Sequence, residues 1–367
     1  DGKDHQSCQF LSKRAPDESH DFTWKEVTTT RGGELAEILG DQLRSVDSLV
    51  VKGNVNDKDF HAMWDASLYG YLSVINLKNA VLENNAVPDT AFFHENEQYE
   101  GSSHEIFYYI GLRKIIFPEG LEKIGEGAFY QASALRQVNF PSTLRYIGDF
   151  AFNATKLEMN QLVIPEGVEE INQYAFAFCR KLKAQVTLPS TIKKIGEWAF
   201  YACPITSINL PEGLESLGSL AFWDCDLREV SIPSSCHEFN EGWQFGFNRN
   251  LEKMHLPEGM TEIPDHFAVD CFRLREVNFP HTLKHIGEKA FSLCISLKNV
   301  DLPLGMQSLG EEAFSELEAL EQIVFPASMK SLGKNSCSYW KNIKRIYCAA
   351  MEPPVCDPTD GGVFSGF

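Results

Sequence analysis

Apolar and polar positions alternate in a short pattern that returns every 22 to 24 residues along most of this chain. Each copy holds an apolar-x-apolar stretch that ends in proline, as in Val138-Asn139-Phe140-Pro141. A period of two predicts a short strand with one buried face. Proline ends that strand because it lacks the N–H that a ladder requires. Ten prolines keep this spacing: Pro118, Pro141, Pro165, Pro189, Pro211, Pro233, Pro257, Pro280, Pro303 and Pro326.

Positions within each copy are counted here from this proline. Positions three and six are apolar, as in Ile192 and Ile195. Position seven is Gly in seven copies and Asn in two, and we expect a left-handed corner there because both residues tolerate a positive φ. Positions ten and eleven are Ala-Phe in seven copies, as in Ala199-Phe200. The small residue lets the chain turn tightly and the Phe fills the centre, so we expect one helical or 3₁₀ turn in this segment.

Five cysteines share position fourteen: Cys179, Cys203, Cys225, Cys271 and Cys294. Ala132, Leu317 and Trp340 hold the same position in other copies, so we interpret it as a core position. The five thiols are therefore predicted to be buried, reduced and stacked in a ladder. Disulfide or metal chemistry is the weaker alternative, because neighbouring coils offer single sulfurs without a CxxC pair or a nearby His ligand.

No single coil of this length can bury its own apolar face, so the copies must stack on one another. The unit L-x-x-I-x-(L/F/I)-P-x-x-(L/V)-x-x-I-G-x-x-A-F-x-x-C resembles that of BspA-like leucine-rich-repeat proteins, from about Leu112 to Ile346. The resemblance implies a right-handed solenoid of short parallel strands. It also implies an exported, non-catalytic surface or secreted protein of Bacteroides-group bacteria.

Two copies depart from the pattern and should distort the solenoid locally, near residues 236–270. One has Trp243-Gln244 in place of Ala-Phe. The other has the inverted pair Phe267-Ala268 after Pro264, where most copies have Gly.

The period weakens toward both ends, which suggests four regions. We expect a tail or tether over residues 1–20, an α/β cap with divergent repeats over 21–111, about ten repeats over 112–346, and a C-terminal cap over 347–367 that is truncated. Within the first cap we expect a helix over Gly33–Leu43, a strand over Ser48–Val51 and a helix over Asn56–Trp64 with Asn56 or Asp57 as its cap. A strand over Leu72–Leu77 and an Ala91-Phe92 corner follow, and then a loop over Glu95–Glu105.

The amino-acid composition limits the classes of ligand that we expect this protein to bind. The net charge of −18 argues against nucleic acid, which requires a clustered basic face, and against anionic lipid. No apolar run approaches the roughly 18 residues that span a bilayer. The chain starts at Asp1 without Met, which suits a mature protein whose export signal has been removed, secreted or anchored at the cell surface through that segment. Protein and polysaccharide ligands are the classes that we expect.

Candidate chemistry is sparse. The chain has no HExxH, no GxSxG and no phosphate-binding Gly-rich loop, so we expect neither catalysis nor a cofactor. His255, His266, His281 and His285 form a surface metal site only as the weaker alternative to solvated histidines. The repeated Pro-Glu-Gly is interpreted as a turn in which Glu is solvated and Gly supplies the bend.

Two outer surfaces are candidates for ligand binding. The residue two places before each proline forms a mostly polar row: Asn139, Thr187, Asn209, Ser231, His255, Asn278 and Asp301. Positions nine, twelve and thirteen carry aromatic residues in the earlier copies and charged or small residues in later ones, such as Lys289 and Glu312. Aromatic residues dominate interface energetics, so the predicted ligand-binding residues are Tyr130, Tyr174, Trp198, Tyr201, Trp223 and Phe245.

Two alternatives compete with this prediction. The aromatic side chains can instead pack over the edge of the core. The whole solenoid can instead act as a structural spacer or stalk on the cell surface.

Overall fold

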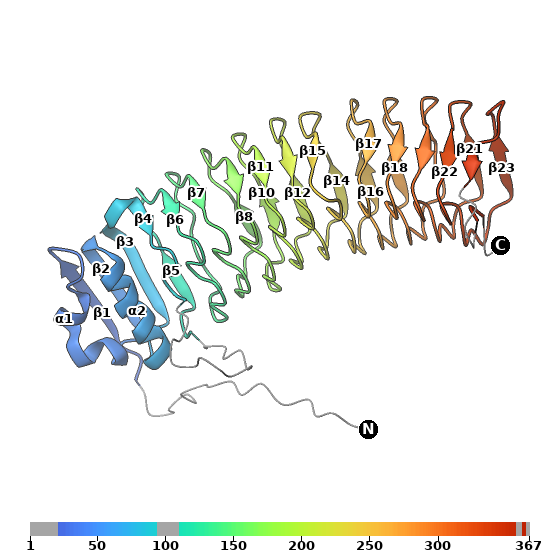
Figure 1. Cartoon of the computed structure of the whole chain (residues 1–367). Coiled ribbons are helices and arrows are strands. Elements are labelled where there is room, and N and C mark those ends of the chain that lie inside the picture. The colour runs from blue at the N-terminus through green and yellow to red at the C-terminus, as the bar shows by residue number, and fades with distance from the viewer. Residues whose placement is uncertain (1–20, 94–109, 357–361, 365–367) are drawn as a thin grey trace, which may run out of the picture. The chain divides into compact units, whose positions relative to one another are not determined.

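The computed structural model describes residues 21–93, 110–356 and 362–364. The predicted tail over 1–20 and the loop over Glu95–Glu105 lie outside these residues. The chain forms two compact units, residues 1–159 and 160–367, here called unit 1 and unit 2. Figure 1 shows the helices in unit 1 and the stacked coils of short strands in both units.

Unit 1 opens with an α/β segment. Its elements are β1 (Trp24–Thr29), α1 (Leu35–Leu39), a 3₁₀ helix η1 (Gly40–Ser45), β2 (Ser48–Val55), α2 (Asp57–Tyr69), β3 (Val74–Leu82), a second 3₁₀ helix η2 (Glu83–Asn85) and β4 (Ala86–Val87). The coils that follow hold β5 (Lys114–Ile116), β6 (Lys123–Ile124) and β7 (Tyr146–Ile147). One parallel sheet has the order β1-β2-β3-β5, and β4, β6 and β7 form successive parallel pairs.

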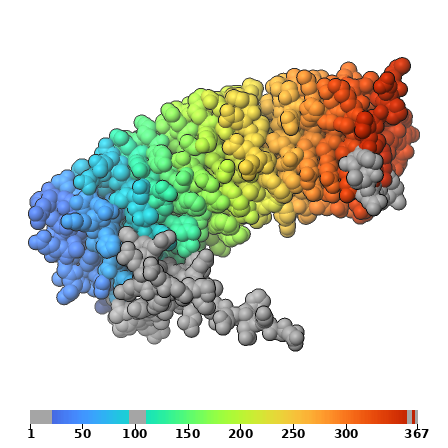
Figure 2. All heavy atoms as spheres, in the orientation of Figure 1, coloured from blue at the N-terminus to red at the C-terminus, as the bar shows by residue number. Residues whose placement is uncertain are grey.

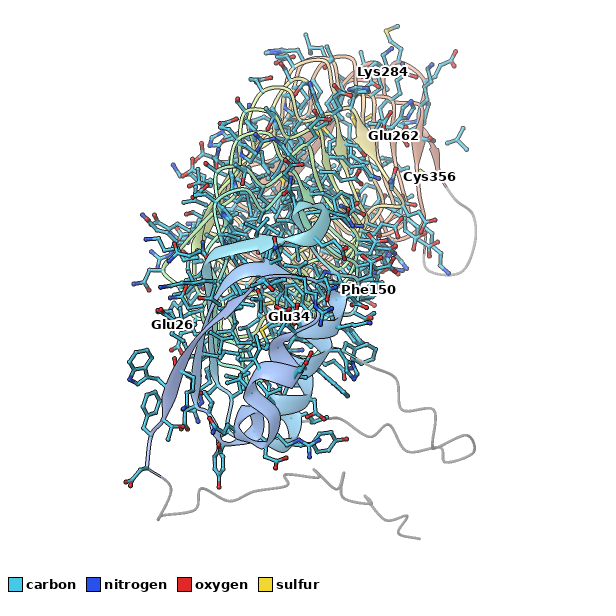
Figure 3. The ribbon with its side chains drawn as sticks, turned by 90° about the vertical axis from the view of Figure 1, so that its left-hand side faces the viewer. Glu26, Glu34, Phe150, Glu262, Lys284 and Cys356 are labelled. Carbon is cyan, nitrogen blue, oxygen red and sulfur yellow. The ribbon has the colours of Figure 1, made fainter. Side chains whose placement is uncertain are left out.

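The Asp59 carboxylate accepts backbone hydrogen bonds at the N-terminal ends of both helices in this segment. The Asn56 side chain accepts from the Lys58 N–H and Asp59 accepts from the Asn56 N–H, which is a capping box for α2. Asp59 is buried and also accepts from the N–H groups of Gly33 (2.6 Å) and Leu35 (2.9 Å). The predicted helix start at Asn56 is therefore confirmed. Figure 3 looks onto this segment, where Glu26 on β1 pairs with Lys52 of β2.

Most coils of unit 2 hold two strands, and every strand pair among the described residues is parallel. The strands before the prolines are β8 (Gln161–Val163), β10 (Gln185–Thr187), β12 (Ser207–Asn209), β14 (Glu229–Ser231), β16 (Lys253–His255), β18 (Glu276–Asn278) and β21 (Gln322–Phe325), and β23 (Arg345–Cys348) follows the last repeat. The strands at positions five and six are β9 (Glu170–Ile171), β11 (Lys194–Ile195), β13 (Ser216–Leu217), β15 (Glu238–Phe239), β17 (Glu262–Ile263), β19 (His285–Ile286), β20 (Ser308–Leu309), β22 (Ser331–Leu332) and, after the last repeat, β24 (Val355–Cys356). On the face seen in Figure 2, the side chains of unit 2 form a closed surface over these coils.

The position-eleven Phe residues form the centre of the core, as predicted. Phe176, Phe200, Phe222 and Phe245 stack at centroid distances of 5.3, 5.6 and 5.6 Å with nearly parallel rings. All four are fully buried. The prediction that Phe245 lies on a binding surface is therefore wrong.

The cause of that error is one inserted residue. Phe245 lies twelve residues after Pro233, whereas Phe200 lies eleven after Pro189. Gln244 takes the place of Ala, and its carbonyl accepts from the Phe222 N–H at 2.9 Å. In the next coil Phe267 replaces Ala, and its ring meets Phe245 edge-on at 5.4 Å instead of stacking. The local distortion predicted near residues 236–270 is confirmed.

The corner after the second strand is not a helical or 3₁₀ turn, and that expectation is wrong. Positions nine and thirteen have positive φ, as at Trp198 (55°) and Ala202 (53°), which interrupts any helical run. The N–H groups of Trp198, Phe200 and Ala202 donate to carbonyls of the next coil. Those of the intervening residues donate three residues back. Among the described residues after Asn85, no helix occurs.

The glycine at position seven serves a different purpose from the one expected. Gly196 is not among the residues with positive φ. A Cβ placed there would lie 2.8 Å from the backbone nitrogen of Gln173 in the preceding coil. Glycine is required because two backbones approach closely, and the left-handed conformation falls at positions nine and thirteen.

Candidate ligand-binding surface

Seven aromatic side chains from four consecutive coils of unit 2 form what we call the aromatic surface. They occupy positions nine, twelve and thirteen, or the equivalent positions of the Pro233 coil once its inserted residue is allowed for. All are half-buried: Tyr174, Phe178, Trp198, Tyr201, Trp223, Trp243 and Phe247. Four of the predicted residues are among them. Trp243 and Phe247 were missed because the inserted residue after Pro233 hides their positions, and an alignment of Phe245 with Phe222 would have revealed them.

The first group of rings is continuous. The rings of Tyr174 and Trp198 stack at 5.2 Å with an interplanar angle of 16°. The centroid of the Tyr201 ring lies 4.2 Å from that of Trp198 and 5.1 Å from that of Phe178. Stacked rings cover part of each other's faces, so this group has less open ring face for a ligand than isolated rings would have.

The second group is built around Trp223. Its indole lies 4.4 Å from the Phe247 ring and 5.2 Å from that of Trp243. It covers Gly246, where an added Cβ would come within 2.1 Å of the Trp223 ring. Trp243 stacks in turn on His266 at 3.6 Å with an interplanar angle of 7°. Glycine at position 246 therefore makes room for the indole.

Charged side chains surround these rings. The Arg180 guanidinium lies 5.6 Å from the Phe178 ring, and that of Arg249 lies 5.7 Å from the Phe247 ring, within the range of cation–π contacts. Burial, followed by the charge of Asp224, raises the pKa of Tyr201. Both polar and apolar groups are thus available to a partner at one surface.

The later coils of unit 2 carry charges where the earlier ones carry rings. Lys289 at position nine lies 3.0 Å from Glu288 and 3.8 Å from Glu312. The asymmetry of the sequence thus corresponds to a change from ring contacts to an ion pair between the position-nine residues of two neighbouring coils, Lys289 and Glu312.

Tyr130 belongs to a group of rings in unit 1. Its ring lies 4.8 Å from that of Phe93 and 6.0 Å from that of Phe150, nearly perpendicular to both. Figure 3 labels Phe150.

The polar row beside the prolines braces the backbone. The Asn209 amide accepts from the Leu188 N–H at 2.9 Å and donates to the Leu188 carbonyl at 3.3 Å. In unit 1, Asn139 does the same to Phe117 at 2.7 and 3.1 Å. These amides extend the ladder beyond the strand, so much of their hydrogen-bonding capacity is used within the protein. That makes this row a weaker candidate for ligand binding.

Comparison with known proteins identifies the repeat. A family model described as "BspA type Leucine rich repeat region (6 copies)" matches residues 102–186, 183–292 and 266–351, more than half of the chain. This chain belongs to the BspA-type leucine-rich-repeat family. A search of curated proteins found no match.

Two solved structures are among those similar to this BspA-type protein. A leucine-rich-repeat protein from Bacteroides ovatus is 23% identical, with a TM-score of 0.58 over 83% of this chain and 79% of that one. A leucine-rich cell surface protein from Faecalibacterium prausnitzii is 21% identical, with a TM-score of 0.40 over 73% of this chain and 83% of that one. The first likeness supports the solenoid fold, and the family is one of binding or scaffold proteins that are generally non-catalytic.

The five position-fourteen thiols of this BspA-type solenoid are buried and form no disulfide. Cys203 donates to the Phe176 carbonyl at 2.8 Å, and Cys225 to that of Phe200 at 3.3 Å. Asn248 and Trp340 hold the equivalent position and donate to the same type of carbonyl, at 2.7 and 2.6 Å. Position fourteen therefore favours a small or planar group with a hydrogen-bond donor, in addition to an apolar one.

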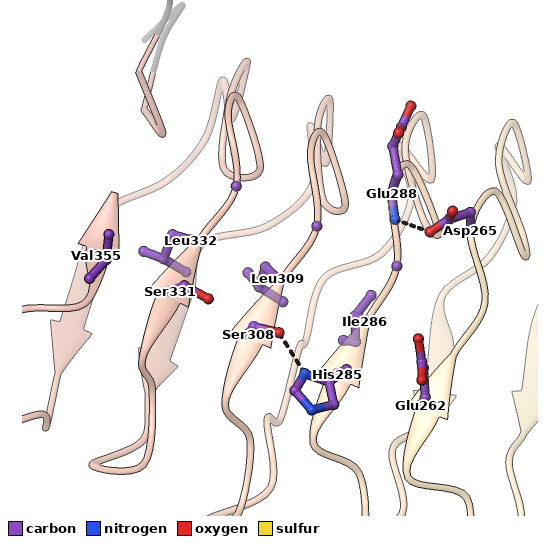
Figure 4. Close-up of a pocket in the computed structure, with 13 residues that line it drawn as sticks. Glu262, Asp265, His285, Ile286, Glu288, Ser308, Leu309, Ser331, Leu332 and Val355 are labelled. Atoms are coloured by element: carbon purple, nitrogen blue, oxygen red, sulfur yellow. Dashed lines mark hydrogen bonds between the residues drawn. The ribbon is translucent and has the colours of Figure 1, made fainter. Parts of the chain in front are cut away.

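A shallow groove of about 560 Å³ runs over β17, β19, β20, β22 and β24. Glu262, Asp265, Glu288, Ser308 and Ser331 are among the residues that line it (Figure 4). The His285 ring nitrogen Nδ1 lies 2.6 Å from the Ser308 hydroxyl, and Asp265 accepts from the Glu288 N–H at 2.7 Å. These polar groups are partly satisfied by one another, and we assign no chemistry to the groove.

The histidines are spread over the coils. His255 lies 3.2 Å from Glu229, and His281 lies 3.0 Å from Glu258. In the part of the chain that the structure describes, no group of three His, Cys, Asp or Glu residues is placed to hold a metal ion. No helix within those same ranges is long and apolar enough to cross a bilayer.

Proposed function

We propose that this chain is an exported, adhesin-like and non-catalytic binding protein, at the cell surface or secreted, and that its ligand contacts the aromatic surface. The observation that carries the proposal is the concentration of seven half-exposed rings in four coils, where later coils hold ion pairs at the same positions. Packing alone does not require rings at these positions, because the later coils fold without them.

A protein ligand suits this surface better than a glycan. Sugars are held by the open face of an aromatic ring, whereas Tyr174 and Trp198 stack face to face and Trp223 lies over Gly246. Ring faces covered in this way are closed to a sugar, whereas Arg180 and Arg249 lie beside the rings. Tyr, Trp and Arg are the residues most enriched at protein interface hot spots.

The test is a binding screen of the purified chain against extracellular-matrix proteins and a glycan array. Trp198→Ala and Tyr201→Ala should each weaken protein binding by about 1–2 kcal/mol. Lys289→Ala and Glu312→Ala, at position nine of the later coils, are the matched controls and should bind like the parent. Binding that survives both aromatic substitutions would exclude this surface.

The second candidate is a structural spacer or stalk. The stacked rings themselves favour it, because they stabilise one another as the Phe core does. Under this alternative Trp198→Ala lowers the melting temperature while the screen finds no ligand. Under the binding proposal a ligand is found, and its affinity falls more than the stability of the chain does.

A further inference from the structure

A hollow of about 500 Å³ opens in unit 1 at positions eight, nine and twelve of three coils. Three aromatic rings line it: Phe93, Tyr130 and Phe150. The Tyr130 ring is nearly perpendicular to the other two, at 87° from Phe93 and 89° from Phe150. All three side chains are half-buried, so each is both held by packing and accessible from the hollow.

The hollow exists because position nine is small in two of these coils. Thr90 and Gly127 stand where later coils carry Tyr, Trp or Leu. Gly127 has the same backbone conformation as those residues, with φ of 57° against 55° at Leu220. A Cβ added at Gly127 would touch Thr90 at 3.6 Å, which is an ordinary contact. A larger side chain therefore has room here, with the same backbone strain that Leu220 carries, and its absence leaves the space open.

Two carboxylates complete the lining. Asp89 and Glu126 occupy position eight of neighbouring coils. Asp89 accepts from the Glu126 N–H at 2.9 Å and lies 3.4 Å from the Lys123 ammonium, which offsets part of its charge. Glu126 is exposed and forms no ion pair within the described part of the chain. The remaining charge at the hollow is negative, in a chain whose net charge is −18.

We propose that this hollow binds an organic ammonium group carrying methyl substituents, such as a trimethylammonium headgroup. Aromatic faces attract a cation through the ring quadrupole, and the attraction is largest for a cation that is weakly hydrated. A methylated ammonium has no strongly held water to lose and presents apolar methyl groups to Phe93, Tyr130 and Phe150. The carboxylates add long-range attraction. A metal ion is disfavoured here because it requires several converging oxygen ligands.

This assignment is independent of the aromatic surface of unit 2, so either can fail without the other. It is tested with choline as the probe, titrated into the full chain and followed by NMR shifts of the aromatic protons. We expect saturable binding in the millimolar range. The uncharged isostere 3,3-dimethylbutan-1-ol should bind about tenfold more weakly, because it has the same shape without the charge.

Three variants locate the site. Gly127→Leu fills the hollow and should abolish choline binding. Its melting temperature should fall modestly, through the strain of a side chain at a positive φ, but the chain should still fold because Leu220 occupies the equivalent position. Tyr130→Leu removes a ring, retains an apolar side chain and should weaken binding about tenfold. Lys289→Leu, at position nine in unit 2, is the control that should bind normally.

The outcomes that overturn the proposal are equally defined. Equal affinity for choline and its uncharged isostere would show an apolar pocket without cation recognition. Binding that persists in both Gly127→Leu and Tyr130→Leu would place the cation elsewhere. If choline binds as expected, a trimethyllysine peptide and phosphatidylcholine vesicles then distinguish a protein source of the ammonium group from a lipid one.

Discussion

Trp198, Tyr174 and Phe150 hold a backbone conformation that large residues usually avoid, with φ of 55°, 54° and 55°. Each such residue costs about 1–2 kcal/mol relative to the right-handed helical region. The cost is offset because the same backbone turn lets the N–H of position nine donate to the next coil, as from Trp198 to the Ser219 carbonyl at 2.9 Å. Ring stacking between coils adds to that stabilisation.

Glycine at position seven provides the first test at this scale. Gly196→Ala should lower the free energy of unfolding by about 1–3 kcal/mol, because the new Cβ collides with the backbone of the preceding coil. Gly259→Ala is the matched control, since that glycine has φ of 97° and nothing within 4 Å of the added Cβ. It should cost only the backbone strain, about 1 kcal/mol. Urea denaturation measures both, and the reverse ranking would contradict the close-approach explanation.

The stability of the folded chain should depend on pH through the protonation of His266. Burial lowers its pKa below the usual value of about 6.5, and the repulsion of Lys289 acts in the same direction while Glu288, Asp265 and Glu312 oppose it. The folded chain therefore favours the neutral ring, and the unfolded chain takes up a proton first. The resulting stability is complete above pH 6.5 and is lost as the pH falls through the unfolded pKa toward the folded one.

The measurement is the melting temperature of the parent and of His266→Gln between pH 7.5 and 5.5. The parent should lose stability relative to the variant as the pH falls. Trp fluorescence reports the same event, because the ring stacks on Trp243. Parallel curves for the two proteins would show that His266 does not titrate in this range.

At the scale of elements, the coils of this solenoid occur in pairs. A coil that begins Pro-Glu-Gly is followed by one that begins Pro-Ser-Thr, Pro-Ser-Ser or Pro-His-Thr. Thr191 accepts from the Gly167 N–H at 2.9 Å and donates to the Val168 carbonyl at 2.8 Å, while Ser190 donates to Glu166 at 3.0 Å. Ser235 and Thr282 repeat the hydroxyl contacts with Gly213 and Gly259. The Glu predicted to be solvated is exposed and also accepts hydrogen bonds from the next coil.

The thiols at position fourteen form a ladder in which each cysteine-bearing coil contributes one side chain. Burial raises the pKa of Cys271 to about 12, and it raises that of Cys203 well above its ordinary value. Because the thiolate is the reactive form, an aromatic disulfide reagent at pH 8 should leave position fourteen unlabelled in the native protein. Cys348 and Cys356 are exposed and should react.

Peptide mass spectrometry assigns the labelled sites, and the urea-unfolded chain is the control in which every thiol reacts. Rapid labelling of Cys203 or Cys271 in the native state would contradict the buried ladder.

At the scale of the whole molecule, neighbouring coils of unit 2 contact each other through parallel strand pairs, and several of them also through stacked Phe rings. A solenoid of this kind is quasi-one-dimensional, so a defect spreads only through adjoining coils. Phe200→Ala should cost about 3–5 kcal/mol through lost burial and a residual cavity.

Hydrogen exchange locates that loss. The amides of the coils with Phe176, Phe200 and Phe222 should exchange faster in Phe200→Ala than in the parent. Those of β20 and β22, several coils away, should be unchanged. A uniform increase over unit 2 would mean that it unfolds as one cooperative block.

Much of the architecture was predictable from one sequence. The prolines marked the strand ends, Ala199-Phe200 and its counterparts marked the core, and Cys203 marked a buried ladder, because each of these depends on periodicity along the chain. The change from rings to charges after His266 was visible for the same reason. The periodicity of the sequence alone therefore determined the solenoid, its repeat and the general location of the aromatic surface.

Contacts between coils were decided only in three dimensions. The role of Gly196, the left-handed Trp198, the bracing amide of Asn209 and the hollow beside Gly127 all depend on which atoms of the neighbouring coil lie opposite. One inserted residue was enough to exchange Phe245 with Trp243 and Phe247 between core and surface, since a shift of one position turns a side chain from the inside of a coil to the outside. Periodicity records which residues repeat, whereas the stacking of backbones a few ångströms apart sets what each repeated residue does.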